Sequence, residues 1–196
     1  MSDERTALRR QLRASRRAIP AGERIAAAER LAGQLFKLPF APRVGHVAGY
    51  WAMDGEIALH AWQVQLPAGC TYCLPVLNED GRLRFAPWQP GAALVTNQHG
   101  IPEPDVPEGA LLEPDAMALV VLPLVGFDTR GHRLGMGGGW YDRSFAFRQS
   151  KKAPPWLVGA AFSLQLIDAL APASWDVAMD AVCSEHDTHL FEAVSA

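Results

Sequence analysis

A near-continuous apolar run over residues 117–125 places the strongest constraint on how this chain folds. A strand with apolar side chains on both faces needs cover on both faces, and such strands are typical of the centre of parallel sheets. Helices then lie on either side of the sheet, because they supply the connections between parallel strands. We therefore expect residues 117–125 in the middle of the sheet of an α/β protein.

Alternating helical and extended patterns support this architecture. Apolar residues recur at helical spacing in residues 4–18 and 23–36, and a short helical segment follows Ile57. A further helix is predicted at residues 141–148, and another runs to Leu170 with Ser163 as its N-cap. Strands are predicted at residues 44–52, 71–77, 82–88, 156–162 and 177–182, the second and third joined as a hairpin. We predict one domain spanning residues 1–196, built as a three-layer α/β/α sandwich with a mostly parallel central sheet.

Composition limits the classes of function that are open to the chain. The 196 residues are 49% hydrophobic and 20% charged, which is enough apolar material for one well-buried core. A net charge of −3 and a pI near 6.1 argue against nucleic acid or an acidic membrane surface as a partner. The arginine-rich N-terminus lacks the apolar core of a secretory signal, and no window approaches the roughly 18 apolar residues of a membrane span. We expect a cytoplasmic location, and separately we expect a monomer.

The chain has three cysteines, and an odd number of cysteines does not suggest a disulfide framework. Cys70 and Cys73 have the C-x-x-C spacing of zinc and redox sites, and Cys183, His186 and His189 are potential further ligands. Residues 71–77 read as a strand, however, and residues three apart on a strand point to opposite faces. We therefore interpret the cysteines as ordinary buried thiols.

A glycine-rich loop follows the central strand. Four of the five residues at 135–139 are glycine, and Arg133 comes just before them. Such a loop leaves backbone N–H groups free to cradle phosphate oxygens, while an arginine balances the charge. Asp142, at the start of the next predicted helix, offers a carboxylate for magnesium. The loop lacks both the Walker Lys-Ser/Thr ending and the G-x-G-x-x-G order, so a plain glycine-rich turn stays open as an alternative.

The residues around this loop carry a resemblance to a known family. Residues 123–128 (PLVGFD) and 131–143 (GHRLGMGGGWYDR) closely resemble the signature of the 5-formyltetrahydrofolate cyclo-ligases, also called 5,10-methenyltetrahydrofolate synthetases. Further segments are similar to that family in the same order: residues 5–9, 53–57, 74–76, 100–104 and 175–182. The resemblance covers almost the whole chain.

The resemblance implies an enzyme that couples ATP hydrolysis, with Mg²⁺, to closure of a folate ring. ATP would phosphorylate the formyl oxygen of 5-formyltetrahydrofolate, with or without further glutamates on the substrate. N10 would then attack the formyl carbon, and phosphate would leave to give 5,10-methenyltetrahydrofolate. The protein would contribute mainly positioning and charge stabilisation.

The resemblance also implies roles at single positions. Arg5 and Arg9 fall on an element that approaches the ATP phosphates and the substrate, Arg5 standing where the family carries lysine. Catalytic roles fall on Arg9, Arg133 and Tyr141. The ATP-binding positions are Arg5, Arg9, Arg133, Leu134, Gly135, Met136, Gly137, Gly138, Gly139, Trp140 and Tyr141.

The implied substrate-binding positions are Trp51, Glu56, Met136, Gly137, Gly138, Gly139 and Trp140. A carboxylate at Glu56 suits the pterin because it can accept two parallel N–H bonds from an aminopyrimidine edge. Trp51 could pack on the pterin ring, and Met136 stands where some family members carry a basic residue. Asp142 and Asp180 fall on the magnesium positions.

Each assignment has a structural alternative. Arg5 and Arg9 could form a solvated helix face, Glu56 could cap a helix, and Trp51 could belong to the core. Asp142 and Asp180 could be carboxylates at a helix start and at a strand end. Two functional alternatives also stay open: a paralogue that uses the same phosphate loop on another substrate, and a non-catalytic folate- or nucleotide-binding protein.

Overall fold

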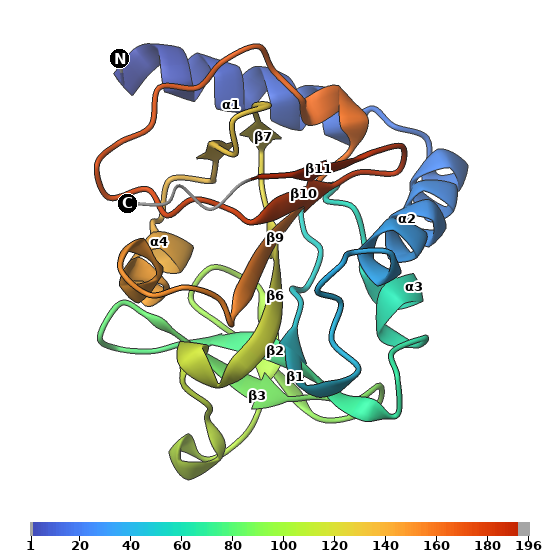
Figure 1. The fold of residues 1–196 in the computed structure, drawn as a ribbon, viewed down its shortest axis with the longest axis vertical. Helices are drawn as coiled ribbons and strands as arrows, with labels where there is room; N and C mark the ends of the chain where they lie inside the picture. The colour runs from blue at the N-terminus through green and yellow to red at the C-terminus, as the bar shows by residue number, and fades with distance from the viewer. Residues whose placement is uncertain (1, 192–196) are drawn as a thin grey trace.

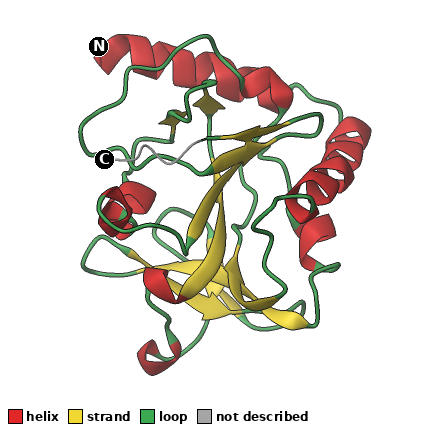
Figure 2. Ribbon diagram, viewed as in Figure 1, coloured by secondary structure: helices red, strands yellow, loops and turns green. Residues whose placement is uncertain are grey.

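The computed structural model describes residues 2–191 and is built around one mixed sheet with helices on both faces (Figures 1 and 2). The helices are α1 (Ser2–Arg17), α2 (Ala21–Phe36), α3 (His60–Gln63) and α4 (Trp140–Ser144), with 3₁₀ turns η1 (Glu108–Ala110), η2 (Pro114–Ala116), η3 (Ala146–Gln149) and η4 (Ser163–Gln165). The strands are β1 (Val44–Ala48), β2 (Gly69–Leu77), β3 (Leu83–Pro87), β4 (Leu94–Thr96), β5 (Pro102–Pro104), β6 (Met117–Pro123), β7 (Gly126–Phe127), β8 (Arg133–Leu134), β9 (Trp156–Ala160), β10 (Ala181–Cys183) and β11 (Thr188–Leu190).

The main sheet has the strand order β11-β10-β9-β6-β1-β2-β3 within the described residues. The strands from β10 to β2 run parallel to one another, and the two edge strands, β11 and β3, pair antiparallel. On β6, Val120 pairs with Ala48 on one side and with Leu157 on the other. The prediction that the apolar run forms the middle of a mostly parallel sheet is therefore confirmed.

The side chains of β6 alternate between two hydrophobic clusters. Leu119 and Val121 pack in the cluster that contains Leu31 of α2, whereas Val120 and Leu122 pack in the cluster on the opposite face. Figure 1 shows α2 and α3 on one side of the sheet and α4 on the other. The three-layer α/β/α architecture predicted from the sequence is thus confirmed.

Helix α1 lies across the end of the sheet at which the parallel strands finish. In Figure 1 it crosses the top of the molecule, beside β7 and beyond the end of β6. Its buried Leu12 packs with Val125, Leu134 and Leu170. The first helix is therefore fixed against the loops at the carboxyl ends of the strands, which is where α/β proteins generally bind ligands.

The segment after β9 departs most from the sequence prediction. A helix is expected from Ser163 to Leu170, but the structure has only η4 followed by irregular chain. The N–H of Ile167 donates to the carbonyl of Phe127 at 2.9 Å, and the N–H of Leu170 donates to Asp128 Oδ2 at 2.9 Å. These tertiary bonds occupy groups that a helix would use internally, so the helix prediction is wrong here.

Other predicted elements exist with different bounds. The hairpin of β2 and β3 is confirmed, β1 stops at Ala48 rather than at residue 52, and β10 covers only the end of the predicted strand 177–182. The helix predicted at residues 141–148 is divided into α4 and η3, because Phe145 between them leaves helical geometry. The short edge strand β11 has no counterpart in the prediction.

The cysteines lie as the strand geometry predicts. Cys73 is buried in one face of β2, and Cys70 packs against the cluster on the other face, so the two thiols do not converge. Cys70, Cys73 and Cys183 are all free. Within residues 2–191, no helix has the length and apolar character needed to cross a membrane.

Candidate active site

The glycine-rich loop connects β8 to α4, and its middle residues, 136–138, are exposed. Gly137 has a φ of +102° and Gly139, at the N-cap of α4, has a φ of +65°, both in the left-handed region that favours glycine. A Cβ on Gly139 would lie 2.8 Å from Arg143 Nη1, the movable end of an exposed side chain, so the constraint at that position is its backbone angle. The loop therefore presents bare backbone to solvent.

Asp128 anchors the β7–β8 hairpin that leads into this loop. Its fully buried carboxylate accepts hydrogen bonds from the N–H groups of Arg130 at 3.0 Å, His132 at 3.0 Å and Leu170 at 2.9 Å. Burial alone would raise the pKa of Asp128, but the bonds from Leu170, His132 and Arg130 outweigh it and lower the pKa to about 2. An ionised carboxylate thus ties the base of the glycine loop to the chain that follows β9.

Arg133 and Asp142 form a buried pair beneath the loop. The Arg133 guanidinium donates to Asp142 Oδ1 and to the carbonyl of Val177, and the N–H of Val177 donates to the same Oδ1 at 3.1 Å. Arg133 is 8% exposed, so two of its donor groups support the loop from below. Asp142 lies in the first turn of α4 with 22% of its side chain exposed, and its Oδ2 makes no hydrogen bond within the described residues. One carboxylate oxygen therefore stays available to a cation.

Asp180 is bonded on both carboxylate oxygens. Arg148 Nη2 donates to Oδ1 at 2.8 Å and to Oδ2 at 3.0 Å, and the N–H of Leu157 donates to Oδ2 at 2.7 Å. The side chains of Asp180 and Arg148 are only 11% and 9% exposed. Over residues 2–191, no three His, Cys, Asp or Glu side chains are grouped to hold a metal ion. A role for Asp180 in binding magnesium, which stays a prediction, would require this ion pair to open.

Two arginines of α1 lie beside the glycine loop. Arg9 Nε donates to the carbonyl of Gly135 at 2.8 Å, and a Cβ on Gly137 would lie 3.8 Å from the Arg9 guanidinium. Burial lowers the pKa of Arg9, and the neighbouring positive charge of Arg5 lowers it further. Arg5 approaches Asp176 at 3.7 Å, and its buried Nε has no hydrogen-bond partner within the described part of the chain. This concentration of positive charge beside bare backbone suits an anionic ligand.

Glu56 lies at the end of a tight turn and is mostly buried, with 11% of its side chain exposed. Its Oε2 accepts the N–H of Met53 at 3.0 Å, and its Oε1 lies 3.5 Å from Arg16 Nη2. Burial raises the pKa of Glu56, while the Met53 N–H and the Arg16 charge oppose that rise. Burial raises the pKa of Tyr141, and the negative charge of Glu56 raises it further. Glu56 thus closes a turn rather than capping a helix.

The two tryptophans predicted to contact the substrate, Trp51 and Trp140, each pack against another ring. Trp51 packs edge-on against Trp88 with ring centroids 5.7 Å apart. Trp140 contacts the His99 ring at 6.0 Å, and the Arg143 guanidinium lies 5.2 Å from its ring centroid. Both tryptophans are partly exposed and could accept a flat ligand ring.

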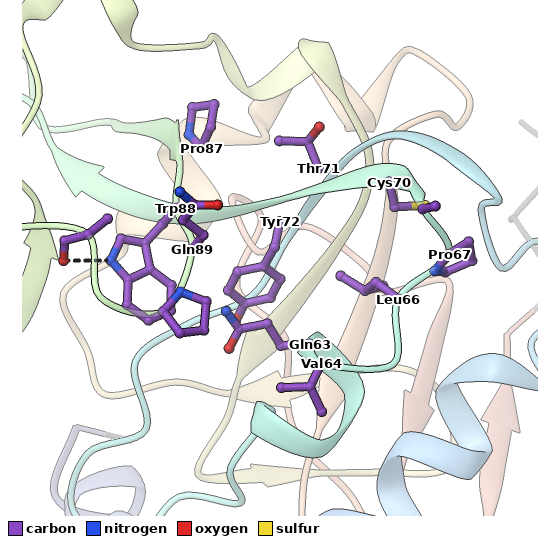
Figure 3. Close-up of a pocket in the computed structure, with 13 residues that line it drawn as sticks. Gln63, Val64, Leu66, Pro67, Cys70, Thr71, Tyr72, Pro87, Trp88 and Gln89 are labelled. Atoms are coloured by element: carbon purple, nitrogen blue, oxygen red, sulfur yellow. Dashed lines mark hydrogen bonds between the residues drawn. The ribbon is translucent and has the colours of Figure 1, made fainter.

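Two hollows adjoin these aromatic residues. The larger has a volume of about 560 Å³, and no charged side chain lines it. Tyr72 and Trp88 are among the side chains that line it (Figure 3). The smaller encloses about 450 Å³ and includes Trp140 in its lining. Residues 135–139 do not line either of these two hollows.

The structure adds three residues that the sequence prediction does not single out. Arg16 is fully buried, and Asp54 and Asp128 bind the segments that carry Glu56 and the glycine loop. The sequence carries only weak signals for them: an Asp-Gly pair typical of turns, and arginines three and four positions apart on a helix.

Known proteins similar to this chain agree in family. Residues 1–185 match the sequence model of the 5-formyltetrahydrofolate cyclo-ligase family. The 5-formyltetrahydrofolate cyclo-ligase of Escherichia coli K12 is 34% identical over 174 residues, covering 87% of this chain and 94% of that protein. The 5-formyltetrahydrofolate cyclo-ligase of Haemophilus influenzae is 36% identical over 135 residues, covering 67% and 71%.

A solved structure supports the same relationship. The NMR structure of the 5,10-methenyltetrahydrofolate synthetase of Aquifex aeolicus superposes with a TM-score of 0.80 at 26% identity, covering 98% of this chain and 95% of that one. The family match therefore extends from the sequence motifs to the whole arrangement of strands and helices. On this sequence and structural similarity, the chain belongs to the 5-formyltetrahydrofolate cyclo-ligase family.

Proposed function

We propose that this protein converts 5-formyltetrahydrofolate to 5,10-methenyltetrahydrofolate with hydrolysis of ATP to ADP and phosphate, in the presence of Mg²⁺. The observation that carries the proposal is the convergence of three features at one end of the sheet. These are the charged Arg9 beside the glycine loop, the Glu56 carboxylate beside Arg16 of the same helix, and Tyr141 in the helix that follows the loop. The names of the curated relatives support the same reaction.

The reaction turns a poor leaving group into a good one. Transfer of the γ-phosphoryl group of ATP to the formyl oxygen forms a P–O bond and releases ADP. N10 then attacks the formyl carbon and loses its proton, the bond between that carbon and its oxygen breaks, and the oxygen leaves in inorganic phosphate. The protein has mainly to hold the reactants in line and stabilise charge on the transferring group.

The groups suited to the phosphates are the exposed backbone of residues 136–138 and the Arg9 guanidinium. Arg5 adds a second positive charge and an unpartnered, buried Nε donor within the described residues. Met136 contributes no charge to this surface, so a nucleotide would depend on the two arginines of α1. Arg133 acts here from beneath the loop, through Asp142 and Val177.

Glu56 is the group suited to the pterin. A carboxylate accepts two parallel N–H bonds only when it is ionised, and each such charge-assisted bond is stronger than a neutral one. Trp51 and Trp140 are partly exposed and supply flat apolar surface for a ring. Tyr141 of α4, whose raised pKa keeps its phenol protonated, offers a neutral hydrogen-bond donor.

Asp142 is the residue that fits magnesium best. Mg²⁺ is often held by one or two carboxylates together with substrate phosphates and water, and Asp142 has one unused oxygen beside the loop. The metal would neutralise negative charge on the phosphate oxygens. Asp180 fits magnesium less well than Asp142, because both carboxylate oxygens of Asp180 already accept hydrogen bonds.

The test is the absorbance of methenyltetrahydrofolate in purified protein mixed with 5-formyltetrahydrofolate. We expect product only when both ATP and Mg²⁺ are present, and we expect Glu56→Gln to raise the KM for the folate more than that for ATP. A protein that binds folate and ATP without turnover would be a non-catalytic binding protein. Absence of both product and folate binding would indicate a paralogue with another substrate.

A further inference from the structure

Arg16 is the only charged side chain among the largest fully buried side chains of the described residues, with 0% exposure. Its Nε donates to the main-chain carbonyl of Asp54 at 3.0 Å, and its Nη1 donates to that of Leu124 at 3.3 Å. Its Nη2 donates to Asp54 Oδ2 at 2.9 Å and lies 3.5 Å from Glu56 Oε1. A buried guanidinium is costly unless its donors are used, so such a placement is informative.

The bonded partner is a turn held in one conformation. Asp54 and Gly55 have φ values of +52° and +76°, and the N–H of Glu56 donates to the carbonyl of Met53 at 2.9 Å. Two central residues with positive φ describe a type I′ turn, in which aspartate is tolerated and glycine is favoured. The turn therefore has no freedom to move Glu56 without breaking its own hydrogen bonds.

Two other, more exposed arginines of α1 also contact the Asp54 carboxylate. Arg13 Nε donates to Asp54 Oδ2 at 2.7 Å, and Arg17 Nη1 lies 3.1 Å from Oδ1. The hydrogen bonds from Arg13 and Arg16 overcome burial and lower the pKa of Asp54. The carboxylate stays ionised and locks the turn to the C-terminal half of α1.

We propose that Arg16 is a positioning residue for folate recognition, which fixes the turn that carries Glu56 and joins it to the helix that carries Arg9. The proposal rests on the function proposed above. The contacts of Arg16 with Asp54 and Leu124 hold the turn that ends at Glu56. Arg16 also lies beside Glu56 Oε1, whereas the Met53 N–H bonds to Oε2. The nucleotide side and the folate side of the site are thereby built on opposite halves of one helix.

The test compares Arg16→Lys with Arg17→Lys. Lysine keeps the charge at either position but cannot form the planar fork that Arg16 uses, whereas Arg17 is 52% exposed and its guanidinium reaches the turn through an ion pair that lysine can also make. We expect Arg16→Lys to raise the KM for 5-formyltetrahydrofolate about tenfold or more, since tenfold corresponds to one lost hydrogen bond of about 1.4 kcal/mol. The KM for ATP should change less than about twofold, and Arg17→Lys should leave both constants at wild-type values.

The melting temperature of each variant separates positioning from folding. If Arg16→Lys does not fold, Asp54→Asn provides the second variant, because asparagine tolerates a φ of +52° and removes the charge of the carboxylate at nearly the same shape. A selective rise in the folate KM in that variant supports the proposal. Equal rises in both KM values, or a folate KM at the wild-type value in a folded variant, overturn it. Absence of turnover in the wild-type protein would instead refute the proposed function.

Discussion

Replacement of Asp128 by asparagine tests how the base of the glycine loop is held. The ionised carboxylate accepts N–H bonds from Arg130, His132 and Leu170 and lies 3.0 Å from His132 Nδ1. Asparagine has nearly the same shape, but its amide group would point two donors at groups that are donors themselves. The change therefore removes the charge and one acceptor oxygen at nearly constant shape.

The pKa of Asp128 gives the size of the effect. Its fall from an ordinary value of 3.8 to about 2 corresponds to roughly 2 kcal/mol of stability, at about 1.4 kcal/mol for each pKa unit. A carboxyl whose pKa is lowered by folding stabilises the protein above its unfolded pKa, and that contribution disappears as the pH falls through the folded pKa. We expect Asp128→Asn to lower the free energy of unfolding by about 2 kcal/mol at pH 7, and the difference from wild type to be about 1 kcal/mol smaller at pH 3.

Urea unfolding at several pH values between 7 and 3 measures this difference directly. Asp115→Asn is the matched control, because Asp115 is exposed and should show no such difference. A difference below about 0.5 kcal/mol at pH 7, the range of an ordinary surface substitution, would refute the anchoring role of Asp128. A difference of the expected size that stays constant down to pH 3 would show that the charge is not its cause.

Three further predictions follow from the site. Arg9→Gln should raise the KM for ATP about tenfold, the size of one charge-assisted bond, while Arg10→Gln on the exposed face of α1 should not; equal values would remove Arg9 from the phosphate site. Gly137→Ala should lower the free energy of unfolding by about 1 to 2 kcal/mol in urea, because alanine is strained at a φ of +102°, and an unchanged value would mean that the loop relaxes. Asp180→Asn should cost about 3 kcal/mol by leaving Arg148 without its buried partner. A shift in the magnesium concentration needed for half-maximal activity would show that Asp180 also binds the metal.

The sequence predicts the centre of the fold well because burial leaves a direct trace in it. The apolar run that becomes β6 carries side chains for both faces of the sheet, and no other arrangement buries them all. The hairpin of β2 and β3 is likewise predicted from a local turn. Elements decided by distant contacts are not predictable in this way. The irregular chain after η4 exists because Phe127 and Asp128, about 40 residues earlier, accept its N–H groups.

The candidate site likewise contains residues that a local sequence pattern predicts and residues that only distant contacts bring into place. The glycine loop and Asp142 are contiguous in sequence, so their pattern alone suggests a phosphate site. The roles of Arg16 and Asp54 depend on a contact between positions 38 residues apart. Helical spacing suggests an exposed, basic face for α1, and only the folded chain buries Arg16 completely. Family resemblance supplies Glu56, but the side chains that hold it in place come from the structure.

The most direct test of the account follows the formyl oxygen through the reaction. If that oxygen is phosphorylated and then leaves as phosphate, 5-formyltetrahydrofolate labelled with ¹⁸O in the formyl group should transfer its label to inorganic phosphate. Mass spectrometry of the phosphate released in a single turnover measures the transfer. The account predicts one labelled oxygen in each phosphate formed with methenyltetrahydrofolate. Label recovered in water, with unlabelled phosphate, would contradict phosphoryl transfer to the formyl oxygen.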